Sequence, residues 1–111
     1  MEDSAVQKAR QAVAELWPRF RPTIMEHLGV LAQATAALEE QRLSDALRLK
    51  AEQEAHKLAG SLGMFGFLEG SRLARAIEMH FRPHAPLTAE VAALRKKVAA
   101  LQRELEKPPA V

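Results

Sequence analysis

The residues of this 111-residue chain that could do chemistry gather around one histidine, His56. At about 100° per residue of helix, His56 lies about 160° from the apolar Leu58, so it points away from the core. Gly60 and Gly63 follow on the same outward face. An exposed imidazole has a pKa near 6.5 and is mostly neutral at neutral pH, which leaves one ring nitrogen available as a nucleophile. The spacing therefore predicts an accessible nucleophilic histidine beside positions that lack side chains.

Gly60 and Gly63, which we call the glycine strip, are costly inside a helix. Each costs on the order of 1 kcal/mol relative to alanine. Missing side chains permit close approach from outside, so the strip is a candidate docking surface. The alternative is that both glycines let a neighbouring helix of the same fold pack tightly, which would leave the exposed His56 unexplained.

Residues 55–67 resemble the signature of histidine-containing phosphotransfer (HPt) domains. In that family the phospho-accepting histidine is followed by leucine after two residues, glycine after four, a small residue after five and glycine after ten. Here those positions hold Leu58, Gly60, Ser61 and Gly66. The Phe-Gly-Phe run at 65–67 is similar to that of the phosphotransfer domain of chemotaxis histidine kinases.

The next helical segment extends this resemblance. Residues 73–78, Leu-Ala-Arg-Ala-Ile-Glu, resemble a Leu-Ala-Arg-x-Leu-Glu run of the family. The resemblance is specific over residues 52–78. It implies that His56 accepts a phosphoryl group and that the fold is a four-helix bundle with an extra N-terminal helix.

One position departs from the family pattern. Many members place a lysine three residues after the histidine, where it helps to hold the phosphoryl group, and this chain has Ala59 there. Lys57 comes one residue after His56 and lies about 100° further round the helix. Lys57 and Arg75 are the candidates to screen phosphate charge, because charge-assisted contacts are the strong ones.

Glu78 is the candidate to orient the imidazole. Attack by one ring nitrogen builds positive charge on the ring, which an acceptor on the other nitrogen would stabilise. Glu78 shares a strip with Ser71, Arg75 and Arg82, and the resemblance supports its role, because chemotaxis phosphotransfer domains have a glutamate at this offset. The alternative is a solvated glutamate that pairs with Arg75 or Arg82.

The resemblance also implies the partners. Receiver domains would exchange the phosphoryl group with His56, or a hybrid histidine kinase would supply it and a response regulator would receive it. The receiver brings the aspartate and Mg²⁺, so this chain needs no cofactor and no metal site of its own. It has no P-loop and no kinase signature, which predicts a carrier without kinase activity. The expected docking face consists of Gln53, Ala59, Gly60, Ser61, Gly63 and Met64.

Five helical segments are expected to position these residues, because apolar residues recur at spacings of three and four along the chain. Pro18 and Pro22 predict a kink or a break near residues 17–22, since interior prolines remove helical hydrogen bonds. Ser44 and Thr88 are candidate N-caps, and the proline-rich residues 82–86 form a loop. We predict an all-α antiparallel four-helix bundle with an additional N-terminal helix, as a single phosphotransfer domain over residues 1–111.

Composition narrows the function classes. The chain has no cysteine, which excludes disulfide scaffolds and thiol nucleophiles. Its net charge is +2, no basic run occurs, and only five residues are aromatic, so a nucleic-acid surface is not expected. The sequence contains no candidate membrane span, and its acidic start is unlike a signal peptide. We therefore expect a cytoplasmic monomer.

Two other functions fit the same helices. The chain could be a non-catalytic helical-bundle adaptor that binds receiver or kinase domains without being phosphorylated, and the missing lysine at Ala59 favours this alternative slightly. The heptad pattern over residues 88–106 could also form a dimeric coiled coil. Bundle core is the preferred interpretation of that pattern, because the other helices need a partner.

Overall fold

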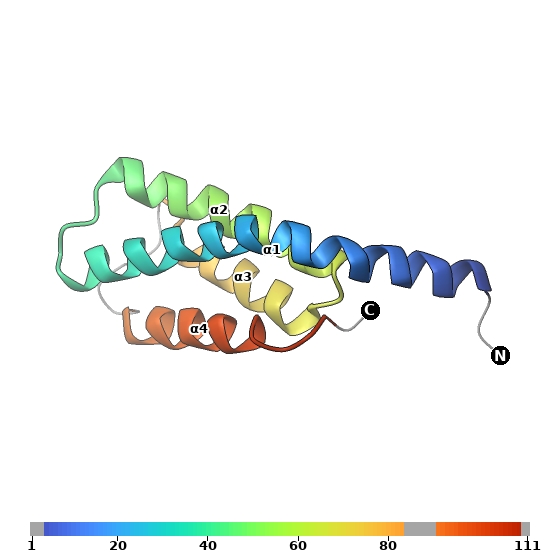
Figure 1. The fold of residues 1–111 in the computed structure, drawn as a ribbon. Helices are drawn as coiled ribbons and strands as arrows, with labels where there is room; N and C mark the ends of the chain where they lie inside the picture. The colour runs from blue at the N-terminus through green and yellow to red at the C-terminus, as the bar shows by residue number, and fades with distance from the viewer. Residues whose placement is uncertain (1–3, 84–90, 110–111) are drawn as a thin grey trace.

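Four α-helices make up the part of the chain that the computed structural model describes, residues 4–83 and 91–109 (Figure 1). They are α1 (Ser4–Glu39), α2 (Asp45–Met64), α3 (Leu68–His80) and α4 (Val91–Glu104). No strand occurs within these ranges, so the predicted all-α bundle is confirmed. None of these helices has the length and apolar character needed to cross a membrane. Thr88 and part of the predicted loop at 82–86 lie outside the described residues.

The first helix is continuous, and both Pro18 and Pro22 lie inside it. The predicted break at residues 17–22 is therefore wrong. Both prolines are exposed, so water can bond to the carbonyl groups that they leave unpaired. Trp17 beside them is anchored, with its ring 5.1 Å from that of Phe65 and 4.8 Å from that of Phe67. The expected additional N-terminal helix is therefore the first part of α1, and Figure 1 shows it extending past the end of the bundle.

The core forms where the apolar stripes of the four helices meet. Its fully buried side chains come from every helix and include Leu31, Leu58, Leu62, Ile77 and Leu101. Burying one such side chain contributes about 1.5–3 kcal/mol. The outward faces of α2 and α3, next to these stripes, remain exposed to solvent and are available to a partner.

A tight turn joins α2 to α3 and makes them a helical hairpin. Gly66 has a φ of 80°, a left-handed conformation that glycine adopts without strain. The amide of Gly66 donates to the carbonyl of Gly63 at 3.2 Å, and that of Phe67 donates to Leu62 at 2.9 Å. This pair of bonds is the Schellman motif that ends many helices. The Phe67 side chain is buried beside the turn, so both backbone hydrogen bonds and apolar packing hold the turn in place.

Two side-chain hydrogen bonds hold α3 against α2. Near the start of α3, the buried Ser71 hydroxyl donates to the Ala59 carbonyl at 2.7 Å. At its end, Arg48 Nη1 of α2 donates to the Phe81 carbonyl at 2.6 Å. Because α3 is tied to α2 at both ends, the side chains between these ties have fixed positions relative to α2.

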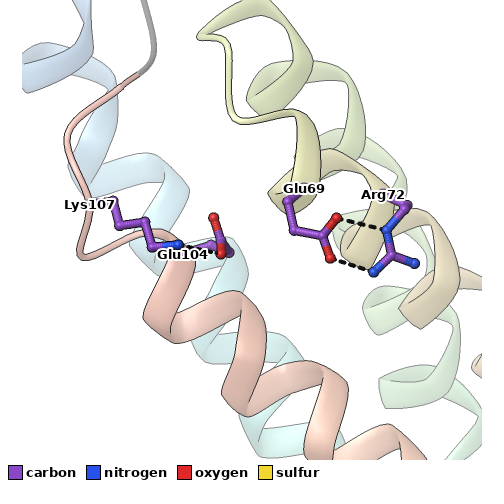
Figure 2. A network of polar contacts seen from close by, with 4 residues as sticks. All are labelled: Glu69, Arg72, Glu104 and Lys107. Atoms are coloured by element: carbon purple, nitrogen blue, oxygen red, sulfur yellow. Dashed lines mark hydrogen bonds and ion pairs between the residues drawn. The ribbon is translucent and has the colours of Figure 1, made fainter.

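Two exposed ion pairs, one at the start of α3 and one at the end of α4, each lie within a single segment of the chain. Figure 2 shows Glu69 with Arg72 at the start of α3, and Glu104 with Lys107 at the end of α4. Arg72 Nε lies 2.8 Å from Glu69, and Lys107 Nζ lies 2.8 Å from Glu104. Each pair joins residues three apart in the sequence and links no two helices. Exposed pairs of this kind contribute little, so apolar packing holds the bundle together.

Candidate functional site

A cleft of about 430 Å³ lies between α2 and α3, around His56. We call it the His56 cleft. Its lining residues come from the middle of α2 and from the second half of α3 with the residues after it: His56, Ala59, Gly60, Arg75, Glu78, Met79 and Arg82. The hairpin turn and the two ties described above therefore build this cleft.

His56 and Glu78 meet across the cleft. His56 Nδ1 lies 3.2 Å from Glu78 Oε1 and 3.3 Å from Oε2. A carboxylate can only accept, so Nδ1 carries the ring proton and donates it, which leaves the lone pair on Nε2. The His56 side chain is 77% exposed, whereas that of Glu78 is 16% exposed. The arrangement presents an accessible, oriented nitrogen nucleophile.

The glycine strip is open on its outer side. A Cβ added to Gly60 would meet no atom of the described residues within 4 Å, and one added to Gly63 would come 3.6 Å from Ser71 Oγ, an ordinary contact. Close helix packing therefore does not require glycine at Gly60. Gly70, to which the sequence analysis gave no role, is the position where helices do pack closely, with Leu62 Cδ1 3.3 Å from an added Cβ.

Most residues of the expected docking face lie on the surface beside the cleft. Met64 is 55% exposed, Gln53 and both glycines are exposed, and Ser61 is half-buried. Ala59 differs, because it is 5% exposed and forms part of the cleft lining, with little area to offer a partner. One exposed apolar side chain that the sequence analysis did not assign to this surface is Met79, which lines the cleft.

The two predicted cations have different positions. Arg75 lines the His56 cleft, whereas Lys57 does not. Lys57 Nζ lies 3.8 Å from Glu54 Oε1 on the same helix. Arg82 also lines the cleft, although the sequence analysis did not name it as a site residue. Its spacing of four from Glu78 was the signal that could have identified it.

A second histidine–glutamate pair joins α1 to α2. His27 Nδ1 contacts Glu54 Oε2, and both side chains are largely enclosed. Burial, with a smaller effect of the Lys57 charge, lowers the pKa of His27. His27 is therefore neutral at neutral pH, as His56 needs to be, but it is not presented to solvent in the same way.

No group of three or more histidine, cysteine, aspartate or glutamate side chains that could hold a metal ion occurs in residues 4–83 and 91–109. The sequence analysis gave this chain no metal site.

Comparisons with known proteins cover most of the chain. The family model described as "Hpt domain" matches residues 15–107. Protein RcaC of Microchaete diplosiphon is 33% identical over 93 residues, which are 83% of this chain. The chain spans only 14% of the length of that curated relative. No solved structure gives a significant match.

Proposed function

Since the chain belongs to the Hpt domain family, we propose that it carries a phosphoryl group on His56 between partners of a multistep two-component phosphorelay. The family supports histidine phosphotransfer in two-component signalling. The observation that carries the assignment to His56 is the bond from its Nδ1 to Glu78, which leaves the Nε2 lone pair free on a side chain that is 77% exposed. Arg75 would screen phosphate charge from the same cleft.

The proposed step begins with a receiver aspartyl phosphate. The Nε2 lone pair attacks phosphorus in line, an N–P bond forms, and the P–O bond to the aspartate breaks with its electron pair staying on the carboxylate. The ring becomes positively charged, and Glu78 stabilises it through the Nδ1 proton. A receiver that holds Mg²⁺ would use it to neutralise charge on the phosphoryl oxygens. The reverse step returns the group to an aspartate.

The glycine strip supports docking of the receiver. A partner helix can approach Gly60 closely, because no side chain stands there and no atom of residues 4–83 or 91–109 lies within 4 Å of an added Cβ. We include Gln53, Ser61, Gly63 and Met64 in this face, and a hybrid histidine kinase could dock on it in the same way. We further propose that residues 1–111 act as one domain, as a monomer in the cytoplasm, without kinase activity or a cofactor of their own.

The test is transfer of label from a panel of phosphorylated receiver domains, with Mg²⁺, to the wild type and to His56→Gln. We expect acid-labile, alkali-stable label on the wild type and none on His56→Gln, and the fastest receiver would identify the partner. Circular dichroism of both proteins checks that the substitution leaves the helices intact.

Two results would contradict the proposal. If receivers bind and neither protein takes label, the chain is a non-catalytic adaptor, and Ala59 becomes the suspected cause. If a broad panel shows neither binding nor transfer, the relay function itself is wrong for this chain.

A further inference from the structure

The His56 cleft contains two arginines whose positive charges are not paired with an anionic side chain of the described residues. In the part of the chain that the structure describes, the guanidinium groups of Arg75 and Arg82 form no hydrogen bond or ion pair, although both residues line the cleft beside Glu78. Most other cations near the hairpin are engaged: Arg48 with Glu52, Lys57 with Glu54, and Arg72 with Glu69.

The charges at the cleft do not cancel. With His56 neutral, Glu78 contributes one negative charge and the two arginines contribute two positive charges. A phosphoryl group adds negative charge at a place where the carbonyl end of α3 already carries partial negative charge. A second cation is therefore needed to make the cleft favourable for a phosphate.

The backbone at Arg82 is held in place. Phe81, the residue before it, is fully buried in the core, and its carbonyl accepts the bond from Arg48. The Arg82 amide lies 3.4 Å from the Met79 carbonyl, which continues the last turn of α3. The guanidinium therefore extends from a fixed point at the end of the cleft, and the chain does not have to order this segment when phosphate arrives.

We infer that Arg82 binds the phosphoryl group on His56 and supplies, from the end of α3, the positive charge that a lysine at the position of Ala59 would have supplied from α2. This inference rests on the function proposed above. A guanidinium can give two parallel hydrogen bonds to phosphate oxygens, so it suits this role better than an ammonium group.

The inference is tested with four variants and two phosphodonors. Arg82→Ala removes the charge, Arg82→Lys keeps the charge but not the paired donors, and Lys57→Ala tests the competing cation. Arg103→Ala, on the exposed side of α4, is the matched control. The donors are a phosphorylated receiver and phosphoramidate, because the small donor does not dock on the glycine strip. Thermal unfolding of each variant checks the fold.

We expect Arg82→Ala to slow labelling of His56 about tenfold with both donors, which is the size of effect typical of losing a charged hydrogen bond. Arg82→Lys should recover part of the rate, and Lys57→Ala and Arg103→Ala should stay near the wild type. An unchanged rate in Arg82→Ala with phosphoramidate, or an equal loss in Lys57→Ala, would overturn the inference. If the wild type itself takes no label on His56, the proposed function fails as well, so the two failures are distinguishable.

Discussion

Helix α2 takes part in two histidine–glutamate pairs, and they differ in accessibility. Toward α1 it provides Glu54, which contacts His27, and the two side chains are 12% and 19% exposed. Toward α3 it provides His56, which is 77% exposed and bonded to Glu78. The residue types are the same in both pairs. Under the function proposed above, a carboxylate beside an imidazole is therefore not enough for a phosphate acceptor, because only the His56 pair presents its imidazole to solvent.

The surrounding charges separate the pairs further. Beside His27, Glu54 also attracts Lys57, so the positive charge there is already engaged. Beside His56, Arg75 and Arg82 line an open cleft. Their guanidinium groups form no hydrogen bond or ion pair with the residues that the structure describes. A phosphate acceptor needs an accessible second nitrogen and available cations, and only the His56 pair has both.

The largest expected effect comes from exchanging the two histidines for glutamine one at a time. We expect His56→Gln to lose all acid-labile label, because His56 is the one histidine among the described residues that lines this cleft, and His27→Gln to keep the wild-type amount. Mass spectrometry of peptides from the labelled wild type locates the phosphate. Phosphate on the peptide that carries His27 would break the comparison.

The two glutamates give the next effect. Glu78→Gln should slow labelling about tenfold, because a neutral amide stabilises a charged ring less well by ~1.4 kcal/mol. Glu54→Gln should leave the labelling rate unchanged. Initial rates at saturating donor measure both. Equal rates in Glu78→Gln and the wild type would show that the hydrogen bond between His56 and Glu78 does not contribute to the reaction.

Two open glycines sharpen the comparison on the surface. Gly60→Leu should reduce transfer from a receiver about fivefold, a loss of roughly 1 kcal/mol of docking energy, while phosphoramidate labelling changes little. Gly29→Leu on α1 is the control, because an added Cβ at either position meets nothing within 4 Å in the part of the chain that the structure describes. Both substitutions should keep or raise the melting temperature, since leucine favours helix over glycine. A fall in stability only at Gly60 would mean that the strip serves packing.

The smallest effect belongs to the third pair, Glu69 with Arg72. The Arg72 hydrogen bond lowers the pKa of Glu69, so the folded state gains stability above the ordinary glutamate value and loses it as pH falls through the lowered value. The pair is exposed, so salt screens it. Melting temperatures between about pH 3 and pH 6 should therefore fall slightly less steeply for Glu69→Gln. A large change, or any change in labelling, would contradict this view of the pair.

Local spacing made much of this molecule predictable. Ser44 caps α2 as expected, with its hydroxyl accepting from the Leu47 amide at 3.1 Å. The outward direction of His56 and Gly60 also followed from the sequence, because positions on one helix are related by a fixed rotation. The strip from Arg75 to Arg82 was visible for the same reason.

The features that escaped prediction depend on contacts between helices. Helix α1 continues through Pro18, where Trp17 packs against Phe65 and Phe67. These two phenylalanines lie outside α1, so the sequence of α1 alone does not reveal this contact. Lys57 lies beside Glu54 and away from the cleft lining, and Arg82 lines the cleft because of where the end of α3 lies. A long side chain can adopt several conformations, and contacts with other helices determine which one is populated.

The hairpin turn at Gly66 has a consequence for how the protein folds. Every lining residue of the His56 cleft lies between residues 56 and 82, so the site closes over a short loop of chain. Local contacts cost little entropy to form and favour rapid folding. We expect substitutions in the hairpin core, such as Leu62→Ala, to slow folding, and those in α4, such as Leu101→Ala, mainly to speed unfolding. Stopped-flow kinetics with the opposite partition would show that the hairpin forms late.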